Sequence, residues 1–254
     1  MKILLSPAKS LQLTDNWKAP LVTQASFLEE SEKLIKKLQK FSPKKIAQQM
    51  SISPDLAELN HARFQQWVKP LEVSENIIPA IFAFNGEVYK GFDVSSLSEL
   101  ELTRAQESLF ILSGLYGVLK PLDLLYPYRL EMGTKWQISP SQKNLYDFWR
   151  KKLTNHIKSE LSANESIVNL ASTEYSKAID FKLLKNSVVI PQFKEFKNGE
   201  FKVVMMYAKH ARGAMARYIV QNNLKEIDEL KLYTVDGYTY DEKQSTESEW
   251  VFVR

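Results

Sequence analysis

Short apolar runs, most of them bounded by proline or glycine, restrict the fold of this chain more than any other feature. Each run is shorter than a typical helix, so we expect interior strands. Amphipathic segments with helical spacing separate the runs, and helices and strands therefore alternate irregularly. This pattern predicts an α+β fold in which a mixed β-sheet is wrapped by helices. The runs are Ile3 to Leu5, Ile77 to Phe84, Leu109 to Ser113 and Val168 to Leu170.

Three helices are expected before the second run. Apolar residues from Phe27 to Leu38 recur at helical spacing, with lysines and glutamates on the other face. Ser42-Pro43 and Ser53-Pro54 each place a hydroxyl at the N-cap position before a proline, which suits the first helical position because its missing N–H costs nothing there. Two further helices should therefore begin at these pairs.

The second half of the chain is richer in β-structure. Ser187 to Phe196 and Phe201 to Tyr207 flank Asn198-Gly199, a pair that favours a type I′ turn, so they predict a hairpin followed by a helix over Ala208 to Gln221. Closing strands are expected at Leu232 to Val235 and Trp250 to Val253.

Composition supports one domain over residues 1–254 and excludes several chemistries. The chain is 44% hydrophobic, and no repeat or Gly/Ser linker marks a boundary. It has no cysteine, which excludes disulfides, thiolate nucleophiles and peroxide reduction by a thiol. Three scattered histidines argue against a histidine-rich metal site, so we expect neither a metal nor a cofactor. No signal peptide or membrane span is expected, and the protein should be cytosolic.

The segment from Tyr128 to Lys135 has the character of an anion-binding loop. Arg129 can make a planar bidentate contact, Lys135 adds a point charge, and Glu131 can orient one of them. A surface salt-bridge cluster explains the same residues equally well.

The helix expected after the hairpin carries Lys209, Arg212, Gly213 and Arg217. A glycine costs about 1 kcal/mol in a helix interior compared with alanine. Small residues beside cations near a first turn would let a phosphate approach the helix N-terminus. Close packing of this helix against a neighbour is the alternative.

Two further motifs are candidates for ligand contacts. Gly114-Leu115-Tyr116-Gly117, preceded by Ser113, resembles the tight hairpin of a helix-hairpin-helix element, in which backbone N–H groups reach a DNA phosphate; an ordinary turn is the alternative. Asn169, Ser172 and Tyr175 could hydrogen-bond a ligand, or Ser172 could cap a helix.

Ser6 and Lys9 match the Ser-x-x-Lys pattern of penicillin-binding enzymes, but the companion motifs of those enzymes are missing. Lys9 is instead expected in a loop that leaves a buried strand, a common place for functional residues.

Taken in order, five of these segments resemble the YaaA family of bacterial peroxide stress proteins. The resemblance covers the whole chain, with one departure: His210 stands where a lysine is common. It implies a cytosolic protein that limits peroxide damage and reactive iron, with a helix-hairpin-helix element beside a basic DNA-binding cleft. The segments are Leu5 to Lys9, Leu112 to Asp123, Tyr128 to Gly133, Asn169 to Ser172 and Lys209 to Gly213.

The leading hypothesis is sequence-independent binding of double-stranded DNA, with bent or damaged duplexes as candidate targets. Its cleft would use Lys9, Arg129, Lys135, Lys209, Arg212 and Arg217, with the Gly114 to Gly117 turn on a phosphate.

Two alternatives remain open. One is an enzyme acting on a small phosphorylated or carboxylated substrate, with Arg129 and Lys209 holding the anion and Glu131 or Tyr175 as the acid–base group. The other is an iron-handling protein, which needs carboxylates such as Asp123, Glu131 and Glu174 to converge.

Overall fold

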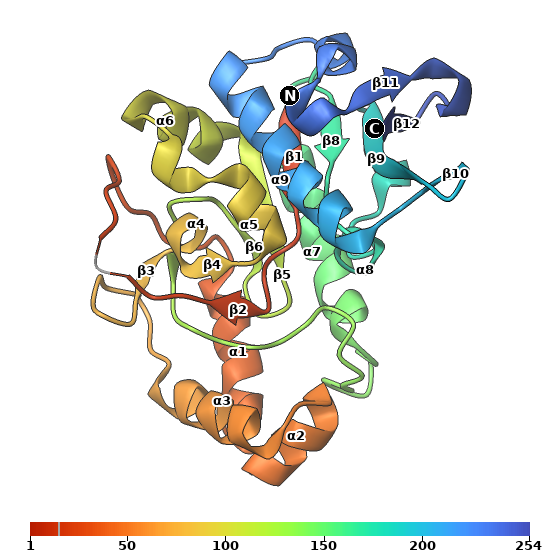
Figure 1. Cartoon of the computed structure of the whole chain (residues 1–254). Coiled ribbons are helices and arrows are strands. Elements are labelled where there is room, and N and C mark those ends of the chain that lie inside the picture. The colour runs from red at the N-terminus through yellow and green to blue at the C-terminus, as the bar shows by residue number, and fades with distance from the viewer. Residues whose placement is uncertain (15) are drawn as a thin grey trace.

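A mixed sheet of eight strands forms the centre of the protein (Figure 1), in a computed structural model that describes residues 1–14 and 16–254. Five adjacent strands run parallel, in the order β12, β9, β8, β1 and β5; β11 and β6 pair antiparallel at the two ends, and β10 pairs antiparallel with β9. The predicted α+β fold with a mixed sheet is confirmed. The strands are β1 (Lys2–Leu5), β5 (Leu109–Ser113), β6 (Gly117–Leu119), β8 (Ile167–Asn169), β9 (Val188–Lys197), β10 (Glu200–Lys202), β11 (Thr239–Asp241) and β12 (Glu249–Val253).

The central strands are apolar because both of their faces are covered. Ile3 of β1 lies opposite Leu109 of β5 on one side and Val168 of β8 on the other, and all three side chains are fully buried. Parallel strands buried on both faces have continuous apolar sequences without alternation. The strands predicted from these three runs are therefore confirmed, as is the closing strand near Trp250.

Two predicted strands are wrong. Ile77 to Phe84 contains a two-residue strand, one helical turn and the start of another short strand, because apolar character reports burial and does not separate a buried helix from a buried strand. The run Leu232 to Val235 lies instead across two 3₁₀ helices. The elements concerned are β3 (Ile78–Pro79), α4 (Ala80–Ala83), β4 (Phe84–Asn85), η3 (Ile227–Leu232) and η4 (Val235–Gly237), and β3 and β4 pair with β7 (Leu124–Leu125) and β2 (Ser10–Leu11).

Helices cover the sheet and extend the molecule beyond its lower end in Figure 1, where α2 and α3 lie away from both termini. The helix predicted over Phe27 to Leu38 is confirmed as α1. Among the helices of residues 1–14 and 16–254, none combines the length and apolar character needed to cross a lipid bilayer. The helices are α1 (Leu28–Leu38), α2 (Pro43–Met50), α3 (Pro54–Gln66), α5 (Glu87–Phe92), η1 (Val94–Ser96), α6 (Glu99–Ser108), α7 (Leu145–Ser159), α8 (Thr173–Ser176), η2 (Phe181–Leu183), α9 (Met205–Asn222) and η5 (Glu242–Gln244).

Both helix starts predicted from Ser-Pro pairs are confirmed. The hydroxyl of Ser42 accepts the backbone N–H of Lys45 at 3.3 Å, and that of Ser53 accepts the backbone N–H of Leu56 at 3.4 Å. Each serine thereby satisfies a donor that the first helical turn leaves without a partner.

Replacing either capping serine with alanine should lower the free energy of unfolding by about 0.5–1 kcal/mol, because one N–H at each helix start loses its acceptor. The two losses should be nearly additive in the double variant, since the caps share no partner. Urea denaturation of Ser42→Ala, Ser53→Ala and the double variant measures them. Ser248→Ala, at an exposed position, is the control and should change stability by less than about 0.5 kcal/mol.

The hairpin predicted around Asn198-Gly199 is also confirmed. Asn198 has φ 56° and Gly199 has φ 83°, the left-handed conformation that a type I′ turn requires at both central residues. The chain after the hairpin differs from the prediction, because α9 begins at Met205, three residues early. From there α9 runs back across the sheet and packs on β9 and β1 (Figure 1).

Candidate functional site

The carboxyl ends of β1 and β8 lie side by side, and from them the chain continues to opposite sides of the sheet. These strands are parallel neighbours, but β1 leads to β5 on one side and β8 leads to β9 on the other. In open sheets with parallel strands, ligands bind outside the strand ends at such a switch point. Ser6 follows β1 here, and Asn169 ends β8.

Ser6 and Ser172 join these two strand ends. The backbone N–H of Ser172 donates to the hydroxyl of Ser6 at 2.8 Å, and their two hydroxyl oxygens are 3.2 Å apart. The hydroxyl of Tyr89 donates to the carbonyl of Ser6 at 3.0 Å, while the amide oxygen of Asn169 accepts the N–H of Ala171 at 3.1 Å. Ser172 stands at the N-cap position of α8, but its hydroxyl makes no capping bond. The capping role considered for Ser172 is therefore wrong, and its hydroxyl fixes the loop after β1.

Buried tyrosines lie behind this loop. The hydroxyls of Tyr128 and Ser113 are 2.6 Å apart and both side chains are buried. Burial raises the pKa of Tyr128 and of Tyr175 well above the ordinary value for tyrosine. Both phenols stay protonated at physiological pH, so Tyr175 cannot serve as a general base there.

The glycine turn at Gly114 to Gly117 is a packing feature. It joins β5 to β6, so strands flank it where a helix-hairpin-helix element would have helices. The carbonyl of Gly114 accepts the indole N–H of Trp149 at 2.9 Å, and a Cβ on Gly114 would lie 3.0 Å from the backbone carbon of Leu130. The turn is buried, as is Tyr116. A DNA phosphate has no access to it, and the predicted phosphate contact is wrong.

Gly213 also has a structural explanation. Because α9 begins at Met205, Lys209, Arg212 and Gly213 lie beyond its first turn, and the predicted anion site at a helix N-terminus is wrong for them. A Cβ on Gly213 would collide with the carbonyl of Val88 and lie 2.8 Å from the backbone nitrogen of Phe92. The alternative interpretation, close packing of α9 on α5, is confirmed.

Three of the six basic side chains predicted to line a DNA-binding cleft form ion pairs with carboxylates. Glu131 accepts Lys9 at 2.7 Å and Arg129 at 3.1 Å, through different carboxylate oxygens. Arg217 is 3.3 Å from Asp93. Burial lowers the pKa of Arg212, whose guanidinium lies largely inside the protein. Lys135 and Lys209 remain exposed, on different elements.

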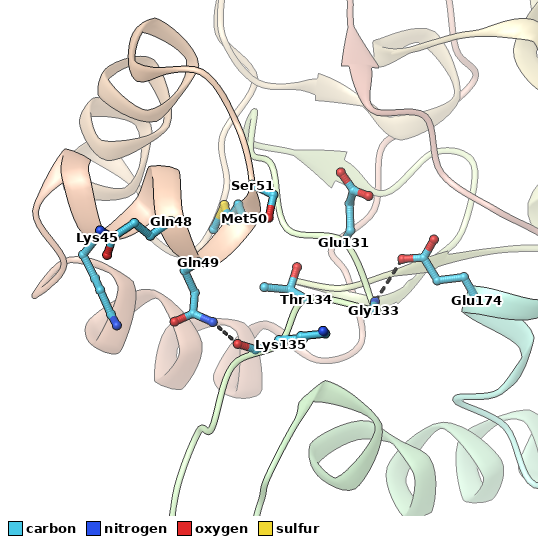
Figure 2. A pocket seen from close by; sticks show the side chains of 10 residues that line it. All are labelled: Lys45, Gln48, Gln49, Met50, Ser51, Glu131, Gly133, Thr134, Lys135 and Glu174. Atoms are coloured by element: carbon cyan, nitrogen blue, oxygen red, sulfur yellow. Dashed lines mark hydrogen bonds between the residues drawn. The ribbon is translucent and has the colours of Figure 1, made fainter.

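A cavity of about 570 Å³ opens between α2 and the loop that follows Arg129 (Figure 2). The backbone N–H of Gly133 donates to Glu174 at 2.9 Å on one side of it, and the side-chain amide of Gln49 donates to the carbonyl of Lys135 on the other. The lining residues are Lys45, Gln48, Gln49, Met50, Ser51, Glu131, Gly133, Thr134, Lys135 and Glu174.

Sequence reasoning predicted α2 but did not connect it with the loop at Arg129. The sequence contained a usable signal, since the two Ser-Pro pairs require two helices separated by a very short turn. That turn runs from Ser51, at φ 53°, to Ser53, and α2 packs against α3.

A basic patch covers the end of α1 and the start of α2. We use this name for Lys37, Lys40, Lys44 and Lys45, all of which are exposed. Lys36 beside them is paired with Glu32 at 3.2 Å. Across residues 1–14 and 16–254, no carboxylate lies within 4 Å of the patch lysines. The patch adjoins the cavity at Lys45.

The three carboxylates considered for iron do not form one site, because Glu131 and Glu174 line the cavity but Asp123 does not. Asp123 is buried and accepts the hydroxyl of Thr23 at 2.6 Å and the backbone N–H of Lys120 at 2.7 Å, while Glu131 holds Lys9 and Arg129. In the described part of the chain, no group of three or more histidine, aspartate or glutamate side chains could hold a metal ion.

Comparison with known proteins places the chain in a family. A family model described as peroxide stress protein YaaA matches residues 1–244. A UPF0246 protein of Aliivibrio fischeri (strain MJ11) is 47% identical over 256 residues, covering all of this chain and 98% of that protein. A UPF0246 protein of Shewanella oneidensis (strain MR-1) is also 47% identical, with 100% and 99% covered, and one of Marinomonas sp. (strain MWYL1) is 46% identical, with 100% and 97% covered. The chain therefore belongs to the YaaA family of peroxide stress proteins.

Proposed function

We propose that this chain acts in peroxide stress by binding double-stranded DNA, largely without regard to sequence, over the basic patch and the mouth of the cavity. The observation that carries the proposal is the exposure of four lysines with no carboxylate partner in the described chain, at the end of α1 and in the first turn of α2, where a helix–turn–helix unit begins. Unpaired surface lysines are free to neutralise phosphates and release counterions.

In this proposal the unit formed by α2, its turn and α3 contacts the DNA phosphates, the role that the sequence had predicted for the Gly114 to Gly117 turn. Its connection is short, Ser51 and Ser53 are exposed, and Ser51 lines the cavity together with Lys45. Such hairpins contact the phosphate backbone and carry little base information, so binding should be insensitive to sequence. Lys135 extends the positive charge to the opposite wall of the cavity.

The proposal also fits the composition. The chain lacks cysteine, so it cannot remove peroxide by thiol chemistry, and protection must act elsewhere. Occupying the DNA itself is a direct route, and it places the protein in the cytosol with the chromosome.

The substrate pocket considered as an alternative has weaker support. Of Arg129, Glu131, Tyr175 and Lys209, only Glu131 lines the cavity in the described chain.

Fluorescence anisotropy with a labelled duplex across a salt series tests the proposal. Lys44→Ala/Lys45→Ala should weaken binding roughly tenfold or more near 0.1 M salt and flatten the salt slope by up to about 1.8, because each lost phosphate contact contributes about 0.9. The matched control is Lys182→Ala/Lys185→Ala, which removes the same charge from an exposed site around η2.

The control pair should bind nearly as the unchanged protein does. Equal weakening in both pairs would mean that total charge alone governs binding. Absence of binding by the unchanged protein at low salt would remove DNA as the ligand.

A further inference from the structure

The cavity beside the basic patch differs from the patch in chemical character. The patch offers ammonium groups alone, whereas the cavity wall adds two carboxylates, two side-chain amides, two hydroxyls and one thioether to the ammonium groups of Lys45 and Lys135. The residues are Glu131, Glu174, Gln48, Gln49, Ser51, Thr134 and Met50 (Figure 2).

The two carboxylates differ in how their charge is balanced. Glu131 is neutralised by Lys9 and Arg129. Glu174 accepts only the backbone N–H of Gly133 through one oxygen, and no described cation lies within 4 Å of it. Its second oxygen, Oε2, has no hydrogen-bond donor among the described groups.

An unbalanced carboxylate repels a phosphate and attracts an N–H donor. Two negative charges a few ångströms apart are unfavourable, and most so where protein surrounds them. In protein–DNA contacts, glutamate accepts hydrogen bonds from the exocyclic amino group of a nucleobase. Met50 supplies a polarizable sulfur of the kind that packs well on aromatic rings. The cavity volume of about 570 Å³ lies within the range of about 300–1,000 Å³ that small-molecule sites occupy.

We infer that the cavity receives a nucleobase extruded from the bound duplex, with Glu174 accepting its amino group. The inference rests on the proposed function, since the basic patch is what brings a duplex to the cavity mouth at Lys45. Extrusion breaks stacking and pairing, and it costs the least free energy where a base is mismatched or damaged. Selectivity for damaged DNA then follows from pairing energy and needs no sequence-specific contact.

Duplexes containing 2-aminopurine test this inference, because the fluorescence of this base rises when it leaves the stack and because its amino group suits Glu174. No aromatic side chain lines the cavity in the described chain, so the seated base should stay bright. The reporter is placed opposite thymine in one duplex and in a mismatch in another. Anisotropy of an end label on the same duplexes shows when the protein is saturated.

At saturation, fluorescence of the mismatched reporter should rise severalfold, with a smaller rise in the matched duplex. In Glu174→Gln the amide oxygen can still accept the N–H of Gly133. The amide NH₂ replaces the other oxygen, and as a donor it cannot accept a hydrogen bond from the amino group of the base. The substitution should abolish most of the rise at protein concentrations where anisotropy of the end label shows that the duplex is saturated. Glu58→Gln, which makes the same charge change on an exposed part of α3, is the control and should retain the full rise.

The outcomes separate the two proposals. Saturating anisotropy without a fluorescence rise overturns base extrusion and leaves DNA binding standing. A rise that survives Glu174→Gln also overturns it, since the base would then be leaving the stack elsewhere. Tight binding of free 2-aminopurine nucleoside without DNA would overturn it in favour of a small-molecule site. No anisotropy change removes the proposed function itself.

Discussion

Replacing Gly213 with alanine is expected to destabilise the protein by about 3 kcal/mol, the upper part of the range for overpacking. The added Cβ would meet the carbonyl of Val88 and lie 2.7 Å from its carbon and 2.8 Å from the backbone nitrogen of Phe92. These atoms belong to a helix backbone and cannot rotate away as a side chain would. The better helix preference of alanine, about 1 kcal/mol, offsets only part of this cost.

Thermal unfolding measures the effect, and the midpoint should fall by roughly 6–12 °C for a chain of this size. Gly199→Ala is the matched control, because no described atom lies within 4 Å of the point that its Cβ would occupy and only its φ of +83° opposes a side chain. That variant should lose about 1 kcal/mol. Equal losses in the two variants would show that close approach of α9 to α5 is not what Gly213 provides.

The contribution of Asp123 to the free energy of unfolding should fall as pH rises from about 4 to 7. Burial raises the pKa of Asp123 from 3.8 to about 6, against the lowering effect of its hydrogen bonds from Thr23 and Lys120. The folded state therefore binds more protons than the unfolded state between these values, and stability declines through that window. Two pKa units at 1.36 kcal/mol each give a loss of at most about 3 kcal/mol.

Comparison with Asp123→Asn isolates this contribution, because the amide does not titrate. The stability difference between the two proteins should change by up to about 3 kcal/mol between pH 4 and 7, in the direction that favours the variant at higher pH. Asp55→Asn, at an exposed position, should show no such step. A difference that stays constant with pH would mean that the two hydrogen bonds balance burial, and one that moves the other way would mean that they outweigh it.

The cations show how far local sequence reaches. The expectation that Glu131 orients a neighbouring cation is confirmed by its ion pair with Arg129, whereas the pairing of Lys9 with Glu131 and of Arg217 with Asp93 was not predicted. Glu131 is only two residues from Arg129, whereas Asp93 and Arg217 are 124 residues apart in the chain. Neither composition nor local spacing indicates whether such distant charges meet.

The glycines illustrate the same limit. Sequence identifies Gly114 and Gly213 as unusual but offers two explanations for each, ligand approach or close packing. Only the neighbouring backbone distinguishes them, and in both cases that backbone belongs to this protein, at Leu130 and at Val88. The Asn198-Gly199 turn was predictable because its conformation depends on the two residues themselves.

Local sequence was enough to predict the features that depend on a few neighbouring residues: the capped starts of α2 and α3, the hairpin turn, the buried central strands and the mixed sheet. It also excluded thiol chemistry. Contacts between distant segments determine which strand ends meet at Ser6 and Ser172, which cations are neutralised, and that α2 and the loop at Glu131 enclose a cavity. Propensities and caps act over one or two turns of chain, whereas charge pairing and cavities depend on contacts between segments far apart in sequence, which the fold must first bring together.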